Sequence, residues 1–288
     1  MKNNNKYLIL LILLLVLISF YIVLSYENMI DIYKSKIALV FTGQPRFVNS
    51  KSYESIKKHL LKKYDCHVYA HFWKSQSKGY ANADDISFNK DIIVDNVEIF
   101  KQLYKPIEIL FEERLIEADV VKKAYDNTFN ITTPYKTISY MTSNKKAFSL
   151  IKDINKYKYI IRLRTDLFIG DMPDLTTASK DNILMTLSDG HDETYKYYDN
   201  LLIFPPKYAG YYMNGIDILD ELYDSGTIMN NEEILHSILK KYDLLQYCID
   251  IPTKEFNTSI IRENNTILLA RGRNSEKSIT LPIDQVLQ

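Results

Sequence analysis

Cysteine is nearly absent from this chain: Cys66 and Cys248 are its only two, too few for a disulfide framework. One bridge between them is compatible with the count, but Cys66 lies in an apolar strand pattern, which favours a buried thiol. An excess of either charge is also missing, because 36 Lys and Arg residues balance 36 Asp and Glu residues. No basic stripe is available to neutralise the phosphates of a duplex, which argues against a nucleic-acid partner.

One long uncharged apolar run is present, from Tyr7 to Tyr26. A helix rising about 1.5 Å per residue needs about 20 residues to cross a hydrocarbon core of about 30 Å. The run is longer than the roughly 7–15 apolar residues of a cleaved signal peptide, which favours an uncleaved anchor. Lys2 and Lys6 precede it, and Glu27 and Asp31 follow it. This asymmetry predicts a type II protein anchored in a lipid bilayer, with its C-terminal domain lumenal or extracellular.

The sequence therefore predicts a cytosolic tail (residues 1–6), a transmembrane signal anchor (7–26), a stalk (27–35) and one domain (36–288). The last segment is long enough to bury one substantial core. Its sequons are compatible with a glycoprotein in a lumenal compartment, and they begin at Asn130, Asn257 and Asn264.

Strand-like and helix-like segments alternate along the domain. Short apolar runs predict strands at Lys36–Thr42, Cys66–Phe72, Ile107–Phe111, Tyr159–Leu163, Asn182–Leu187 and Asn200–Phe204. Helical spacing predicts helices at Ser52–Lys63, from a capping box at Asp95–Glu98 to Pro106, and at Ser143–Ile154, Pro206–Tyr223 and Asn231–Lys241. This order predicts an α/β fold, a mainly parallel sheet with helices on both faces.

Ligands of such sheets bind beyond the carboxyl ends of the strands, so the polar residues there are candidates for a site. Gly43, Gln44 and Arg46 follow the first strand. Glycine permits close backbone approach to a ligand, and the planar fork of arginine suits a phosphate. The alternative is a Gly-Pro turn beside a surface arginine.

Two further strand ends carry candidate residues. The second strand ends in His71 and Trp73, whose rings either stack on a nucleobase or close the edge of the core. The fourth strand carries Arg162 and leads into Arg164 and Asp166. A carboxylate in this position can hold a hard divalent cation that binds a diphosphate. A buried Arg–Asp ion pair is the competing interpretation.

Five segments in this order resemble a family of GT-A-type glycosyltransferases found in bacterial surface-polysaccharide loci and large DNA viruses. The segments are GQPR, DCHVYAHFW, YKYIIRLRTDLFI, DNLLIF and NEEIL. The likeness runs from about Lys36 to Tyr247, nearly the whole domain after the anchor. Each motif is short, so the specificity of the resemblance comes from the order and spacing of the motifs.

The resemblance implies a nucleotide-binding GT-A-like sheet, a nucleotide-sugar donor and a glycan or protein acceptor. Donor binding would fall to Gly43, Gln44, Arg46, His71, Trp73, Arg162 and Arg164. Asp166 would be the last acid of the metal-binding Asp-x-Asp signature, which takes Mn²⁺ or Mg²⁺. Asp199 would border the acceptor, and Glu232 would be the general base, although a first-turn acid also serves as a plain helix start.

The sequence departs from the family at the metal signature, because Arg164 replaces its first acid and no histidine follows His236. Arg164, Arg271 and Arg273 are therefore candidates for binding the diphosphate without a metal. The departure also keeps a second hypothesis open, a non-catalytic carbohydrate-binding surface or virion module. A phosphohydrolase with Asp166 as nucleophile is weaker, since Phe168 stands where a second acid is needed.

Overall fold

A computed structural model describes residues 12–21, 35–46, 48, 51–74, 90–113, 123, 125, 134–170, 172–187, 197–251, 258–262, 266–269 and 280–282. The chain divides into two compact units, Met1–Ser35 and Lys36–Gln288. In the first unit, residues 12–21 form a helix with exposed side chains. No helix within the described ranges is long and apolar enough to cross a membrane. The predicted anchor extends past this helix into residues outside the described ranges, so it stays a prediction.

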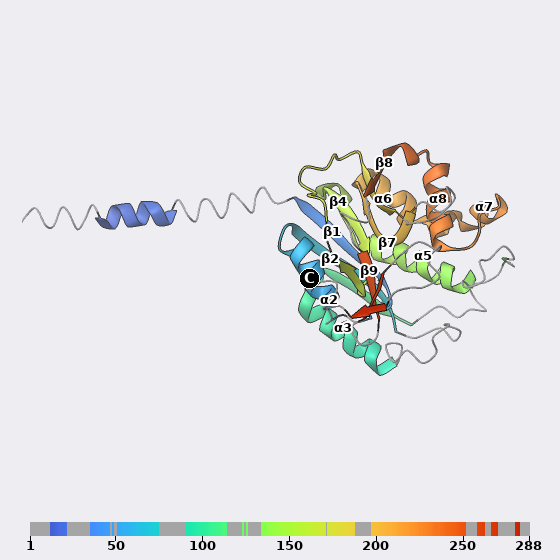
Figure 1. Ribbon diagram of the computed structural model, residues 1–288, viewed down its shortest axis with the longest axis horizontal. Coiled ribbons are helices and arrows are strands. Elements are labelled where there is room, and N and C mark those ends of the chain that lie inside the picture. The colour runs from blue at the N-terminus through green and yellow to red at the C-terminus, as the bar shows by residue number, and fades with distance from the viewer. Residues whose placement is uncertain are drawn as a thin grey trace, which may run out of the picture. The chain divides into compact units, whose positions relative to one another are not determined.

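A seven-stranded sheet, in the order β3-β2-β1-β4-β7-β6-β8, is the centre of the second unit (Figure 1). The strands are β1 Lys36–Gly43, β2 Asp65–Trp73, β3 Glu108–Glu112, β4 Tyr159–Leu163, β6 Ile183–Leu187, β7 Tyr197–Phe204 and β8 Cys248–Ile251. Neighbours from β3 to β4 are parallel, as are β6 and β8, whereas β7 is antiparallel to both of its neighbours. The predicted α/β architecture with a mainly parallel sheet is confirmed.

A second, antiparallel sheet has the order β11-β10-β9-β5. Its strands are β5 Leu167–Ile169, β9 Thr258–Arg262, β10 Thr266–Leu269 and β11 Thr280–Pro282. The chain moves from the first sheet to the second within three residues, since β4 ends at Leu163 and β5 begins at Leu167. The polar residues 164–166 therefore lie at the junction of the two sheets.

Helices cover both faces of the large sheet, as predicted (Figure 1). Successive residues of β1 point to opposite faces: Leu39 packs with α2 and α3, whereas Val40 packs with α5, α6 and α8. Both faces of the strand are buried, which explains its continuous apolar sequence. The helices are α2 Lys51–Ile56, α3 Lys90–Tyr104, α5 Pro134–Ser149, α6 Pro206–Met213, α7 Leu219–Asp224 and α8 Asn231–Lys241. Shorter helical turns are η1 Lys57–Leu61, η3 Ile154–Lys156, η4 Gly215–Ile218 and η5 Leu245–Tyr247.

Several predicted helix boundaries were wrong. The predicted helix Ser52–Lys63 is α2 followed by the separate turn η1, which ends at Leu61. The proposed capping box at Asp95–Glu98 lies inside α3, which extends back to Lys90. Helix α5 begins nine residues before Ser143, at Pro134, because the fixed φ of proline suits the first position of a helix. It ends at Ser149, and η3 is a separate turn.

The predicted helix Pro206–Tyr223 is two helices separated by η4. The break falls at Gly215, which is buried tightly against α5 and α8. A Cβ there would collide with Met141 and would lie 2.6 Å from Cδ1 of Ile238. Close packing at this glycine fixes the bend between α6 and α7.

Both cysteines are free thiols. Cys66 is partly rather than fully buried, and burial raises the pKa of its thiol to about 12. The thiol therefore stays protonated at neutral pH and is a poor nucleophile.

Candidate functional site

The strand registers bring the polar strand ends to one edge of the large sheet. Gly43 of β1 is opposite Phe72 of β2, and Phe41 is opposite Leu163 of β4. Strand β7 runs the other way, so its beginning rather than its end lies at this edge, with Leu201 opposite Leu163. The edge therefore carries the segments after β1 and β4 and the segment around Asp199.

Gly43 has a left-handed backbone conformation, with φ of 101°. Apart from the two neighbouring residues, no described atom lies within 4 Å of the position that a Cβ would take. Its N–H donates to Oγ of Ser143, at 2.8 Å. The backbone is thus held by α5 on one side and open on the other, as close approach of a ligand requires.

His71 lies fully buried beside Ser143. Its Nδ1 is 2.8 Å from Oγ of Ser143, and its Nε2 is 3.3 Å from Oε1 of Glu112. Burial lowers the pKa of His71 to about 4, although Glu112 acts in the opposite direction. Burial also raises the pKa of Glu112, but hydrogen bonds from Lys146 and His71 outweigh it and lower that pKa overall. The neutral imidazole therefore links Glu112, through Ser143, to the Gly43 turn.

Trp73 is buried as well, with 2 % of its surface exposed. Its Nε1–H donates to the carbonyl of Ser139 at 3.3 Å, and its ring meets the His71 ring edge-on at a centroid distance of 4.4 Å. Neither ring offers an exposed face on which a nucleobase can stack. The burial favours the core interpretation of this pair over the donor-binding interpretation.

Thr165 joins the segment after β1 to the segment after β4. Its Oγ1 accepts the backbone N–H of Arg46 at 2.8 Å and contacts the carbonyl of Gln44 at 3.5 Å. The hydroxyl of Ser52 donates to the Thr165 carbonyl. The Arg46 guanidinium donates to Oε1 of Gln44 at 3.1 Å. Thr165 could not be singled out from its local sequence, because its role depends on a partner 119 residues away.

Arg164 and Asp166 form a bidentate ion pair. Nε and Nη2 of Arg164 donate to the two carboxylate oxygens at 2.8 Å and 2.7 Å. Asp166 is 1 % exposed, so both of its oxygens are held inside the protein. The described ranges contain no group of three or more His, Cys, Asp or Glu residues that could hold a metal ion, at this site or at any other. A divalent cation needs several oxygen ligands, and the described residues of the signature offer only the carboxylate of Asp166, which Arg164 already binds. Arg271 and Arg273 lie outside the described ranges.

Arg162 points inward, below the edge. Its Nε donates to Oγ1 of Thr42 at 3.0 Å, and its Nη1 donates to the carbonyl of Asp199 at 2.5 Å. Its guanidinium carbon lies 4.5 Å from the centroid of the Tyr140 ring. With 1 % of its surface exposed, Arg162 ties β1, β4, β7 and α5 together. The family resemblance implied that Arg162 binds the donor, whereas its side chain is buried between these elements.

Asp199 and Glu232 both act on one buried tyrosine, Tyr212 of α6. Burial raises the pKa of Tyr212, and the negative charges of Asp199 and Glu232 raise it further. Tyr212 is hydrogen-bonded to Tyr140 at 2.9 Å. Two acids, one from β7 and one from the first turn of α8, thus influence the same side chain electrostatically. The partly exposed Glu232 is not the cap of α8, because that role belongs to Asn230, whose Oδ1 accepts the N–H of Glu233.

No family model and no curated protein matches this chain. Among solved structures, it is similar to the glycosyltransferase GlyE of Streptococcus pneumoniae TIGR4, with a TM-score of 0.39 and 11% identity over 76% of this chain. The apo form of the same enzyme gives a TM-score of 0.42 and 10% identity over 77% of this chain. The matched regions cover 45% and 46% of those two chains, so this chain spans less than half of their length. Scores below 0.5 do not establish a shared fold.

Proposed function

We propose that the second unit is a glycosyltransferase, which binds a nucleotide sugar at the carboxyl edge of the parallel strands and transfers the sugar to a glycan or protein. One observation carries the proposal. This edge joins an open glycine turn, two arginines and a carboxylate from different elements: Gly43, Arg46, Arg164 and Asp199. A second carboxylate, Glu232 of α8, acts electrostatically on the same tyrosine as Asp199. Carboxyl edges of parallel sheets are the usual ligand sites of α/β proteins. The order of the five sequence motifs supports the same function.

The donor would bind along the segment after β1. The open space at Gly43 lets a nucleotide approach the backbone, and the Gln44 carbonyl and amide lie next to it. The diphosphate would lie near the guanidinium groups of Arg46 and Arg164, whose positive charge stabilises the departing group. Since the Asp166 carboxylate is bound by Arg164, no step of the proposal depends on a metal ion.

The acceptor would bind on the side of β7 and α8. As the acceptor oxygen forms a bond to the anomeric carbon, the bond to the diphosphate breaks and the acceptor proton passes to a carboxylate. Glu232 is proposed as that base, because it is partly exposed, lies in the first turn of α8 and, like Asp199, acts electrostatically on Tyr212.

The proposal also includes a membrane anchor at Tyr7–Tyr26, with the domain lumenal or extracellular. Its support is the uncharged apolar run with lysines before it and acids after it. In the described part of this run, apolar side chains are exposed: Leu17 is 65% and Phe20 is 64% exposed. A contiguous apolar surface of this kind favours contact with lipid or protein over contact with water.

A second candidate function is a non-catalytic carbohydrate-binding module. The observation in its favour is the Arg164–Asp166 ion pair, which occupies the carboxylate expected to bind the metal of a GT-A-type enzyme. A module of this kind would bind glycans without binding nucleotides. Nucleotide binding therefore separates the two candidates.

The test is a calorimetric titration of the purified full chain with UDP, GDP, CMP and dTDP. We expect one nucleotide to bind with a Kd below about 1 mM. Arg46→Gln should weaken that binding about tenfold or more, because a charge-assisted hydrogen bond contributes about 1.5–3 kcal/mol. The matched control is Lys101→Gln, which removes one positive charge from an exposed position on α3 and should leave the nucleotide affinity unchanged. If no nucleotide binds, the transferase proposal fails and the non-catalytic module is the better account.

A further inference from the structure

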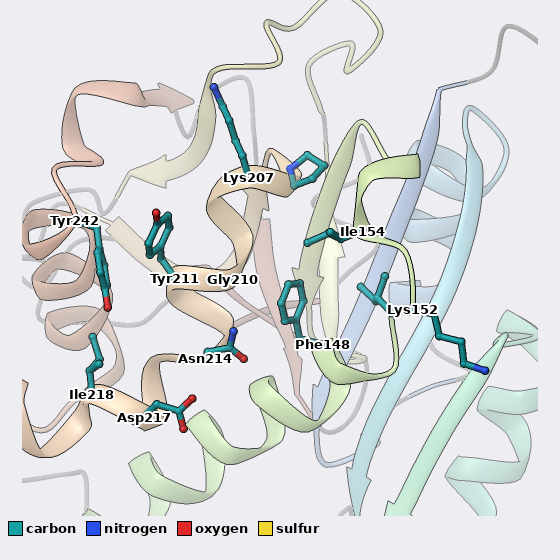
Figure 2. Close-up of a pocket in the computed structure, with 12 residues that line it drawn as sticks. Phe148, Lys152, Ile154, Lys207, Gly210, Tyr211, Asn214, Asp217, Ile218 and Tyr242 are labelled. Atoms are coloured by element: carbon teal, nitrogen blue, oxygen red, sulfur yellow. The ribbon is translucent and has the colours of Figure 1, made fainter.

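A pocket of about 550 Å³ opens on the other edge of the large sheet, between α5, α6 and η4 (Figure 2). Its position follows from the antiparallel direction of β7: Phe204, next to the start of α6, is opposite Ile160 near the beginning of β4. On α5, Phe148 lines this pocket, whereas Ser143 contacts Gly43 at the carboxyl edge. The cavity, called the α6 pocket below, is therefore separate from the proposed donor and acceptor sites.

Aromatic rings form much of the α6 pocket. Phe148, Tyr211 and Tyr242 line it, and Tyr211 is 43% exposed. The Tyr211 and Tyr242 rings lie with their centroids 4.4 Å apart and their planes tilted by 38°. Helix α6 has glycine at position 210, where a Cβ would lie 3.7 Å from Nδ2 of Asn214 and 3.8 Å from Cε1 of Phe148. The missing side chain leaves room between an aromatic ring and an amide.

Polar groups are few and lie beside these rings. Asn214 and Asp217 also line the pocket, and Figure 2 shows the Asn214 amide between Phe148 and Tyr211. An amide offers two donors and an acceptor, and a carboxylate offers acceptors. A pocket of this size with aromatic walls and a few convergent polar groups is typical of a small-ligand site.

The charges around the α6 pocket favour an uncharged ligand. Asp217 is paired with Lys145 at 2.5 Å, and Lys207 is paired with Asp181. The amino groups of Lys207 and Lys152 extend away from the aromatic rings in Figure 2. Among the described lining residues, neither lysine directs its ammonium group toward the rings, and the charge of Lys145 is already paired with Asp217, so a phosphate or carboxylate ligand would find little positive charge there.

We propose that the α6 pocket binds a neutral sugar unit of a glycan. A sugar ring has an apolar face of C–H groups and a rim of hydroxyls, which matches a tyrosine or phenylalanine face bordered by an amide and a carboxylate. The C–H face would lie on Tyr211 or Phe148, and the hydroxyls would bond to Asn214 and Asp217. This binding does not require the proposed transferase activity. If that activity is present, the pocket holds a glycan at a distance from the reacting sugar.

The test uses the purified full chain and saturation-transfer difference NMR with lactose, maltose, cellobiose and N,N′-diacetylchitobiose, each up to about 10 mM. At least one disaccharide should bind. Tyr211→Ala should weaken it at least tenfold, whereas Tyr211→Phe keeps the ring and should stay within about threefold. Gly210→Ala fills part of the cavity without a clash and should also weaken binding. The matched control, Ile107→Ala, truncates an exposed apolar side chain outside the pocket and should bind like the unaltered chain.

Four results would overturn the proposal. One is the absence of binding by every disaccharide. Another is equal binding by Tyr211→Ala and the unaltered chain, or equal weakening by Ile107→Ala. The last is displacement of the bound sugar by UDP, since a nucleotide in the α6 pocket contradicts the assignment to a neutral ligand.

Discussion

Acidification should destabilise this fold, and the fully buried side chain of His71 should make the largest contribution. Its pKa is lowered from 6.5 to about 4 by burial, so the unfolded chain binds a proton between these two pH values and the folded chain does not. The free energy of unfolding therefore falls as the pH drops below about 6.5, and the loss is complete near pH 4. Integrated between about pH 7.5 and pH 5, the loss is about 2 kcal/mol, and the full difference is about 3 kcal/mol.

The groups that face His71 do not cancel this loss. Ser143 and Trp73 do not titrate in the window, and the pKa of Glu112 is lowered from 4.5, so that carboxyl titrates below it. Lys146, which is bonded to Glu112, adds a positive charge that opposes protonation of the imidazole. Between about pH 5 and pH 7.5 the fully buried His71 should therefore contribute more to the loss than His67 and His236, although burial lowers the pKa of these two side chains as well.

The assay is denaturant unfolding of the full chain across this window, compared with His71→Gln. Glutamine keeps hydrogen-bonding groups but does not titrate, so about 2 kcal/mol of the acid-induced loss should disappear, whatever the variant's absolute stability. His67→Gln is the matched control. Burial lowers its pKa too, but its side chain is 25% exposed, so its part in the loss should be smaller. An acid-induced loss that is unchanged in His71→Gln would refute the assignment of this titration to His71.

Three further predictions concern close packing and buried hydrogen bonds. Gly215→Ala should destabilise the fold by about 1–3 kcal/mol because of overpacking. Gly210→Ala, where a Cβ would make ordinary contacts in α6, should be neutral or stabilising by up to about 1 kcal/mol. Thermal unfolding of the two variants checks this difference. Trp73→Phe should cost about 1 kcal/mol for its lost hydrogen bond and leave nucleotide affinity unchanged. A parallel loss of affinity in a titration would restore the donor-binding interpretation. Arg162→Met should lower the free energy of unfolding by on the order of 3 kcal/mol, because the buried Thr42 hydroxyl and Asp199 carbonyl lose their hydrogen-bond donor. A midpoint of urea unfolding equal to that of the unaltered chain would contradict this.

The sequence predicted the strands best where both faces of a strand are buried. The bounds of β4 and α8 agree with the predicted ones, because continuous apolar runs and a helical apolar face are strong local signals. Helix α5 was predicted poorly, since its buried face contains Ser139, Ser143 and Asn144, which interrupt the apolar pattern. Strand β5 has three residues, too few for any periodicity.

The location of the candidate site was predictable, but the orientation of its side chains was not. Parallel topology places all carboxyl ends at one edge, so Gly43 and Arg164 were expected together. The inward direction of His71 depends on its partner Ser143, which is 72 residues away in the sequence. The bidentate bond between Arg164 and Asp166 was one of two interpretations, and local sequence does not distinguish an ion pair from a metal ligand.

Donor turnover by the full chain tests the central claim most directly. Nucleotide release would be measured with UDP-, GDP-, CMP- and dTDP-sugars in the presence of Mn²⁺, Mg²⁺ or EDTA. The account predicts release from one donor, persistence of that release in EDTA, and a loss of about 100-fold or more in Glu232→Gln, as expected for removal of a general base. Asp166→Asn should reduce the melting temperature, because it weakens a buried ion pair. Absence of release from every donor, or unchanged release in Glu232→Gln, would contradict the account.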